Sequence, residues 1–131
     1  MKKTLKSNFK DKRGRIIDIF VKKPKDHCSL VTFNKGAIRG NHFHKKTIQY
    51  AFVLEGKILA KSKKVGMNLE EVTLEPGDLI SHDFYEAHMF EALVDSKFLV
   101  LSSGLRTGKD YELDTFRLSS LIEDFSEADI K

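Results

Sequence analysis

Short runs of β-forming residues alternate with turn signals along most of this chain, and that spacing limits the folds it can adopt. Asn34-Lys35-Gly36, Glu55-Gly56 and Glu75-Pro76-Gly77 are typical of tight turns, because Gly and Pro favour the backbone angles that reverse a chain. The runs that indicate strands are residues 15–21, 29–33, 47–54, 57–62, 69–74, 78–82, 87–93 and 97–102. Many short strands separated by turns favour an all-β sandwich or barrel over alternating strands and helices.

The length of 131 residues suits one domain with a single core. We expect one domain over residues 1–131, with a barrel over about 14–103, a basic segment at 1–13 and a C-terminal extension at 104–131. Apolar runs such as 51–54 and 98–101 are far shorter than the roughly 20 residues of a membrane span, so we expect no membrane contact. No apolar segment follows the basic N-terminus, and the lone Cys28 fits a reducing cytoplasm, which is the location we expect.

The periodicity changes near the C-terminus. The apolar residues there are spaced as on one face of a helix; they are Leu118, Leu121, Ile122 and Phe125. Ser119 or Ser120 is a candidate N-cap. We therefore expect a short amphipathic C-terminal helix whose apolar side covers the barrel or a neighbouring subunit.

Basic residues crowd the N-terminus of a chain whose net charge is +4. They are Lys2, Lys3, Lys6, Lys10, Lys12, Arg13 and Arg15. We expect a solvated, partly mobile leading segment. The functional alternative is that its charge attracts an anionic small molecule such as a phosphorylated ligand. No recognition helix, zinc finger or aromatic-interleaved basic stripe accompanies the charge, so a nucleic-acid partner is not expected.

Two histidines in the middle of the chain, His42 and His44, are separated by one residue in an extended stretch. Side chains alternate along a strand, so these two imidazoles point to the same side. Gln49 opens the next run, and His88 lies in a more distant run that an antiparallel barrel can bring alongside. The pattern predicts one site built from His42, His44, Gln49 and His88.

The run after the two histidines has two different faces. The small or polar face suits the wall of a cavity and consists of Gln49, Ala51 and Val53. The bulky face suits packing between sheets and consists of Ile48, Tyr50, Phe52 and Leu54. The alternation therefore places Tyr50 on the side away from Gln49.

The stretch from Gly36 to Gly56 resembles the first sequence motif of the cupin superfamily. That motif has Gly, five residues, His-x-His, three or four residues, Glu, six residues and Gly; here every spacing fits and Gln49 replaces the Glu. The second cupin motif is degenerate, but His88 keeps its register relative to Gly77. The resemblance covers about residues 14–103 and implies a single-domain cupin, that is, a jelly-roll β-barrel.

Within the cupins, the string Arg39-Gly40-Asn41-His42-Phe43-His44-Lys45-Lys46 resembles a narrower, RmlC-like group. Residues 11–15 and Asp110-Tyr111 are also similar to that group. Its members are 3,4-ketoisomerases and, more distantly, 3,5-epimerases of dTDP-linked 4-oxo-6-deoxy sugars used in cell-surface polysaccharide or glycoprotein biosynthesis. The resemblance implies a homodimer with strand exchange and a nucleotide-sugar substrate. His88 departs from the ketoisomerases, which do not typically carry a histidine there.

One chemistry that these residues support is that of an isomerase or epimerase without a cofactor. Imidazole can remove a proton next to a sugar ketone once the developing enolate is stabilised, so His42 or His44 is the candidate base. Arg39 suits a bidentate contact with a diphosphate, and Lys45 adds a second charge. The other candidates are Tyr50 or Tyr85 for the second proton and Asn41 and His82 for substrate binding.

The alternative chemistry is that of a metal centre. His42, His44 and His88 offer three imidazole ligands and Gln49 a fourth, oxygen ligand, a set that suits Zn²⁺, Fe²⁺, Ni²⁺ or Cu²⁺. The neutral Gln49 should weaken the binding of a divalent ion without abolishing it. In this alternative the protein is a metal-dependent enzyme of another activity or a small-ligand-binding module. The string from Arg39 favours the isomerase and His88 favours the metal, so the sequence leaves both open.

Overall fold

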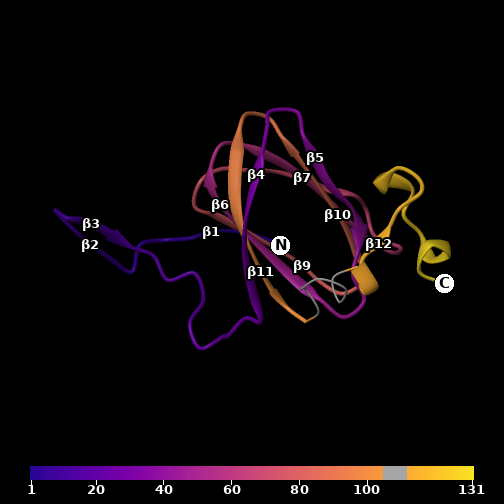
Figure 1. Cartoon of the computed structure of the whole chain (residues 1–131), viewed down its shortest axis with the longest axis horizontal. Helices are drawn as coiled ribbons and strands as arrows, with labels where there is room; N and C mark the ends of the chain where they lie inside the picture. The colour runs from indigo at the N-terminus through magenta and orange to yellow at the C-terminus, as the bar shows by residue number, and fades with distance from the viewer. Residues whose placement is uncertain (105–111) are drawn as a thin grey trace.

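Two antiparallel five-stranded sheets form a barrel in the computed structural model, which describes residues 1–104 and 112–131 (Figure 1). One sheet has the order β1-β9-β6-β11-β4, with bounds Lys2–Thr4, Asp78–His82, Ile48–Glu55, Ser96–Ser103 and His27–Phe33. The other has the order β12-β5-β10-β7-β8, with bounds Phe116–Arg117, Ile38–Phe43, Glu86–Ala92, Ile58–Lys64 and Glu70–Leu74. The predicted all-β jelly roll is confirmed.

The core lies between the two sheets, because alternate side chains of each strand turn inward. Phe98 of β11 packs edge-on against Phe33 and Phe90, with ring centroids 4.9 and 5.0 Å away. These rings fill the inner space, so β6 contributes the small Ala51 and Val53 to the same core. Burial of each such ring stabilises the fold by about 1.5–3 kcal/mol.

The bulky face of β6 lies on the outside of the barrel, which corrects the prediction that it packs between the sheets. Tyr50 meets Phe20 at a centroid distance of 5.0 Å, and Leu54 is exposed. The physical reason is that large side chains from neighbouring strands already occupy the interior. Phe20 belongs to the run 15–21, which was predicted as a strand but is extended only at its start.

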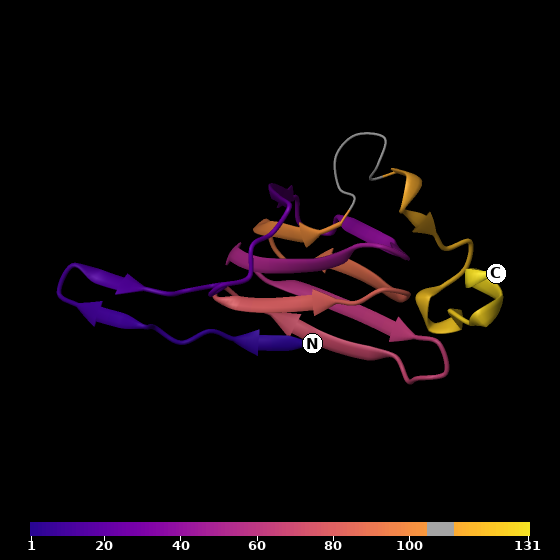
Figure 2. The ribbon, with the colours of Figure 1, turned by 90° about the horizontal axis from the view of Figure 1, so that it is seen from below.

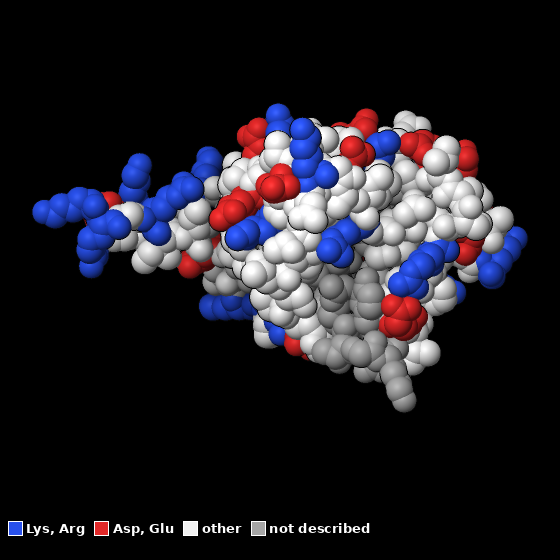
Figure 3. All heavy atoms as spheres, turned by 45° about the horizontal axis from the view of Figure 1, so that its top comes forward, with Lys and Arg blue, Asp and Glu red and all other residues white. Residues whose placement is uncertain are grey.

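An arm projects from the barrel near the N-terminus (Figures 1 and 2). It is a hairpin of β2 (Phe9–Asp11) and β3 (Gly14–Ile16), a two-stranded sheet of its own. Strand β3 ends at Ile16 because Ile16 pairs with Phe9, the first residue of β2, and β2 offers no further residue for pairing. The basic leading segment is thus partly ordered: β1 pairs with β9, and Lys and Arg side chains gather on the arm (Figure 3).

The C-terminus corrects the predicted amphipathic helix. It forms two short 3₁₀ turns, η1 (Ile122–Asp124) and η2 (Glu127–Ile130), and a Ser126 capping box begins the second. Ile122 and Phe125 are buried beside Phe43, as the apolar spacing indicated, because residues three apart share a side of a 3₁₀ turn. Leu121 is exposed. No helix in the described ranges is long and apolar enough to cross a membrane.

Candidate active site

Strand register brings the predicted polar residues of one sheet into a single row. His88 of β10 pairs with His42 of β5 on one side and with Ser62 of β7 on the other. Arg117 of β12 pairs with His42 from the far side. Residues that are distant in sequence therefore become neighbours because the antiparallel strands lie in this order.

A second polar row crosses the opposite sheet. Gln49 of β6 pairs with His82 of β9 and with Ser102 of β11, and all three side chains are buried. The two rows meet in a cluster of imidazoles inside the barrel. The ring centroid of His88 lies 4.7 Å from that of His42 and 4.5 Å from that of His82.

His44 adjoins this cluster and is held at both ring nitrogens. Its Nδ1–H donates to the carbonyl oxygen of Asp114 at 2.7 Å, and its Nε2 lies 3.1 Å from Oε1 of Gln49. The Asp114 carboxylate accepts the backbone N–H groups of Lys45 and Lys46 and the Thr47 hydroxyl. Asp114 therefore fixes both the His44 ring and the turn that follows it.

A glycine makes the close contact between β5 and β10 feasible. Gly40 has φ +96°, and a Cβ there would lie 2.8 Å from the His88 carbonyl oxygen. The register shifts between His88 and Met89 at this point, as in a β-bulge. The next residue, Asn41, also has a positive φ of 60°. The bulge therefore depends on residues that tolerate the left-handed region, and it sets the direction of His42.

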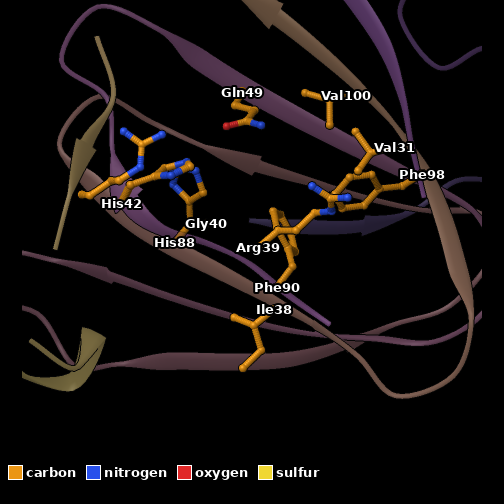
Figure 4. A pocket seen from close by; sticks show the side chains of 11 residues that line it. Val31, Ile38, Arg39, Gly40, His42, Gln49, His88, Phe90, Phe98 and Val100 are labelled. Atoms are coloured by element: carbon orange, nitrogen blue, oxygen red, sulfur yellow. The ribbon is translucent and has the colours of Figure 1, made fainter. Parts of the chain in front are cut away.

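A cavity of about 300 Å³ opens beside the imidazole cluster (Figure 4). His42, His88 and Gln49 line its polar end, and Arg39 lies across from them. Its apolar wall consists of Val31, Ile38, Phe90, Phe98 and Val100. The cavity thus offers imidazole groups at one end and a guanidinium within reach of an anionic substrate.

Burial controls the protonation of His82. Desolvation lowers the pKa of its imidazole well below the ordinary value, and the adjacent His88 ring lowers it further. His82 is therefore neutral at physiological pH. It stacks on His88 with an interplanar angle of 9° and does not line the cavity, although the sequence made it a substrate-binding candidate.

Several predicted residues lie outside the cavity. Tyr50 is on the outer face of β6, and Tyr85 is exposed and stacked on Phe43. Lys45 places its Nζ over the Phe116 ring, 4.3 Å from the centroid. Asn41 uses its carbonyl to accept the N–H of Leu118. None of these four lines the cavity, so the structure does not bring them to it.

Arg117 and Asp114 are the site residues that sequence reasoning missed. Arg117 lines the cavity and donates two hydrogen bonds to Glu112, which lower the pKa of that carboxyl. Both residues lie in the C-terminal extension, where no local pattern relates them to His42 or His44. The Asp110-Tyr111 resemblance falls outside the described residues.

The donor set fits a divalent metal. One ring nitrogen from each of His42, His44 and His88 lies within 4.8 Å of the others. The Nδ1–H groups of His44 and His88 donate to backbone carbonyls of Asp114 and Glu86, the usual orientation of metal-binding histidines. These three residues, with Gln49 oxygen adjacent to His44, would hold an ion that supplies Lewis-acid chemistry when bound.

Comparison with known proteins identifies related folds. A solved sugar 3,4-ketoisomerase from Thermoanaerobacterium thermosaccharolyticum, in complex with TDP, is 21% identical with a TM-score of 0.75, over 91% of this chain and 88% of that one. A 3,4-ketoisomerase from Helicobacter canadensis is 19% identical with a TM-score of 0.76, over 90% of each chain. A dTDP-4-dehydrorhamnose 3,5-epimerase from Sulfolobus tokodaii is 20% identical with a TM-score of 0.73, over 94% of this chain and 83% of that one. All share the jelly-roll fold.

The match to a protein family covers most of the barrel. No curated protein matches the chain. A family model described as the polysaccharide biosynthesis C-terminal domain matches residues 9–102, which include the arm, strands β5 and β10 with His42 and His88, and every residue that lines the cavity except Arg117. The chain is therefore a member of the polysaccharide biosynthesis C-terminal domain family.

Proposed function

We propose that this protein is a sugar-nucleotide isomerase or epimerase acting on a dTDP-4-oxo-6-deoxyhexose in cell-surface polysaccharide biosynthesis. The observation that carries the proposal is the cavity in which His42 and Arg39 face the same space. Proteins of the same fold include a ketoisomerase solved with TDP and an epimerase named for dTDP-4-dehydrorhamnose. The substrate is a nucleotide sugar, and the cytoplasm is the proposed location.

The proposed reaction moves a proton and needs no redox partner. The His42–His44 pair removes the proton from C3, next to the C4 ketone; the C–H electrons form the C3–C4 double bond, and the C4 carbonyl oxygen takes up the carbonyl electron pair and a proton, which gives an enediol. Return of a proton to C4 and loss of the C3 hydroxyl proton leave the ketone at C3. In an epimerase the proton returns to the carbon that lost it, from the opposite face.

The two histidines of this pair have different surroundings. His42 lines the cavity, whereas His44 lies behind it, between Asp114 and Gln49. The Gln49 amide can accept a hydrogen bond from a protonated His44 or, turned over, donate one to the neutral ring. Gln49 can thus form a hydrogen bond with both the protonated and the neutral His44 ring, and a side chain that takes up and returns a proton needs a partner in both forms.

Arg39 and Arg117 are the proposed contacts for the diphosphate. Both line the cavity, and a guanidinium pairs with phosphate oxygens through two parallel hydrogen bonds. Arg39 is oriented by a hydrogen bond to the Thr32 carbonyl and lies 5.2 Å from the Phe33 ring centroid. These two contacts therefore fix the position of the Arg39 guanidinium before a substrate binds.

Solvent deuterium exchange tests the proposal. Incubation of a panel of dTDP-4-oxo-6-deoxyhexoses in D₂O is expected to place deuterium at C3 and C4 for a ketoisomerase, or at C3 and C5 for an epimerase. His42→Asn and His44→Asn should each slow the conversion by about 10²–10⁴-fold, and the variant that loses exchange altogether identifies the base. His27→Asn is the matched control. No exchange with any sugar of the panel would refute the proposal.

A metal-dependent cupin of other function is the second candidate, and the convergence of three imidazoles favours it. Metal analysis of protein purified without chelators separates the two. The isomerase proposal expects less than stoichiometric metal and exchange that survives chelation. A stoichiometric transition metal that is lost in His88→Ala, together with exchange lost on chelation, would instead support the metal-dependent reading.

We also propose that the protein is a homodimer. The arm exposes Phe9 and Ile16, whose relative exposures are 52% and 58%, on a hairpin with no core of its own. An isolated two-stranded hairpin is marginally stable in water, so contact with a second copy would give these side chains a partner.

A further inference from the structure

A second hollow lies on the other side of the histidine cluster from the active-site cavity. This basin, of about 650 Å³, is bordered by β1, β9 and the ends of β7 and β8. The stacked pair of His82 and His88 separates the two spaces, because His82 lines the basin and His88 lines the cavity. Among the described residues, no side chain lines both.

Lysine side chains dominate the charge of the basin. They are Lys2, Lys3, Lys23, Lys63 and Lys64. The carboxylates there are Glu70, Asp83 and Glu86, and the last two already accept backbone N–H groups of Phe84 and Asp83. Lys2 also forms an ion pair with Asp78, and Lys63 donates to the Glu123 carbonyl. The five ammonium groups still outnumber the carboxylates of the lining, so the space has a positive potential that attracts a multiply charged anion.

The inner wall of the basin carries an unsatisfied donor or acceptor. His82 is 2% exposed, and its Nε2 has no hydrogen-bond partner within the described part of the chain. Buried polar atoms are almost always paired, so such an atom calls for a ligand or a water molecule. Ser62, which is 6% exposed, adds a hydroxyl to the same wall.

We propose that this basin binds a phosphate-class anion at a site separate from the nucleotide-sugar cavity. Compact ammonium groups on flexible stems suit phosphate oxygens, which accept several charge-assisted hydrogen bonds at once. In the tautomer with its proton on Nε2, the neutral His82 ring adds a donor to the Ser62 hydroxyl on the inner wall, and donors of this kind suit an anion. Inorganic diphosphate is the simplest anion of this class.

Calorimetric titration with inorganic diphosphate tests the site, and a background that carries both Arg39→Ala and Arg117→Ala removes the two guanidinium groups of the active-site cavity. Binding is expected to persist in that background. Adding Lys3→Ala and Lys64→Ala should weaken it by about tenfold or more, since each removes a charge-assisted contact. Adding Lys35→Ala and Lys57→Ala instead removes the same charge elsewhere on the surface, and should change the affinity by less than about twofold.

The ring resonances of His82 give a second readout at fixed pH. Diphosphate should shift them in the protein with Arg39→Ala and Arg117→Ala and leave them unmoved in the variant that also lacks Lys3 and Lys64. Inorganic phosphate and dTMP, titrated in parallel, show whether the occupant is a free anion or the phosphate of a nucleotide. Loss of binding in the protein with Arg39→Ala and Arg117→Ala, or equal weakening by the two lysine pairs, would overturn the proposal.

Discussion

At the scale of single residues, Gln49 has the greatest chemical consequence. A carboxylate at this position would carry a negative charge next to His44, whereas the amide is neutral and lies 3.1 Å from the ring nitrogen. The imidazoles around it are buried, so a charge there would be poorly screened by solvent. The identity of this one side chain therefore affects whether the histidine cluster binds a metal ion or removes a proton from a substrate.

Gln49→Glu is expected to raise the affinity for Zn²⁺ by at least about tenfold, because it adds a charged oxygen ligand to three imidazoles. Titration of metal-free protein with Zn²⁺ in a competition assay measures the change. Gln49→Met, which fills similar space without an oxygen, is the matched control. Equal affinities in the Glu and Met variants would contradict the prediction.

The buried His82 makes stability depend on pH. Its pKa in the folded protein is lowered by burial, whereas in the unfolded chain it is about 6.5. Below about pH 6.5 the unfolded state binds a proton that the folded state does not, so the free energy of unfolding falls as the pH drops toward the folded-state pKa. Above pH 6.5 the titration of His82 no longer changes the free energy of unfolding.

Urea unfolding between pH 5 and 8 measures this effect. One such group contributes a slope of at most about 1.4 kcal/mol per pH unit. His82→Phe keeps the ring stacking and removes the titration, so its slope below pH 6.5 should be smaller by that amount. The same slope in wild type and variant would show that His82 does not titrate on unfolding.

At the scale of elements, the contact between β5 and β10 decides the geometry of the site. The bulge at Gly40 allows His42 and His88 to face each other across the two strands. The sequence pattern predicted β10 as a strand but gave only an extended stretch around His42 and His44 in place of β5. Nothing in it indicated a bulge, because Gly40 reads equally well as part of a loop. The close backbone approach exists only once the strands pair.

Gly40→Ala tests this contact against Gly36→Ala. Both glycines have a positive φ, but only a Cβ at Gly40 meets a backbone atom, the His88 carbonyl oxygen. Gly40→Ala should therefore lower the free energy of unfolding by about 1–3 kcal/mol more than Gly36→Ala. Denaturant titration of the two variants measures the difference. Equal losses would show that the backbone angle alone matters.

At the scale of the whole molecule, the arm and the barrel behave as different parts. The barrel has an apolar core of its own, whereas the arm has none and leaves Phe9 and Ile16 exposed on a narrow hairpin (Figure 2). Replacing both with Ser is expected to shift the protein from dimer to monomer, since a dimer would lose apolar contact area at each arm.

Light scattering coupled to size-exclusion chromatography measures the mass of this variant. Met67→Ser, which removes a similarly exposed apolar side chain from the barrel, should leave the mass unchanged. A wild-type protein that elutes as a monomer at all concentrations would contradict the homodimer proposal and leave the barrel fold untouched.

The sequence by itself determined the all-β fold and the placement of His42 and His44 on one side of the chain, because alternation and turn residues act locally. The resemblance to the cupin motifs added Gln49 and His88 to the same site. Tertiary structure alone decided that Arg117 and Asp114 join the site and that Tyr50 and Tyr85 stay outside it. It also turned the predicted C-terminal helix into two 3₁₀ turns. These outcomes depend on which strands pair and in what register, and that is set by packing between segments distant in the chain.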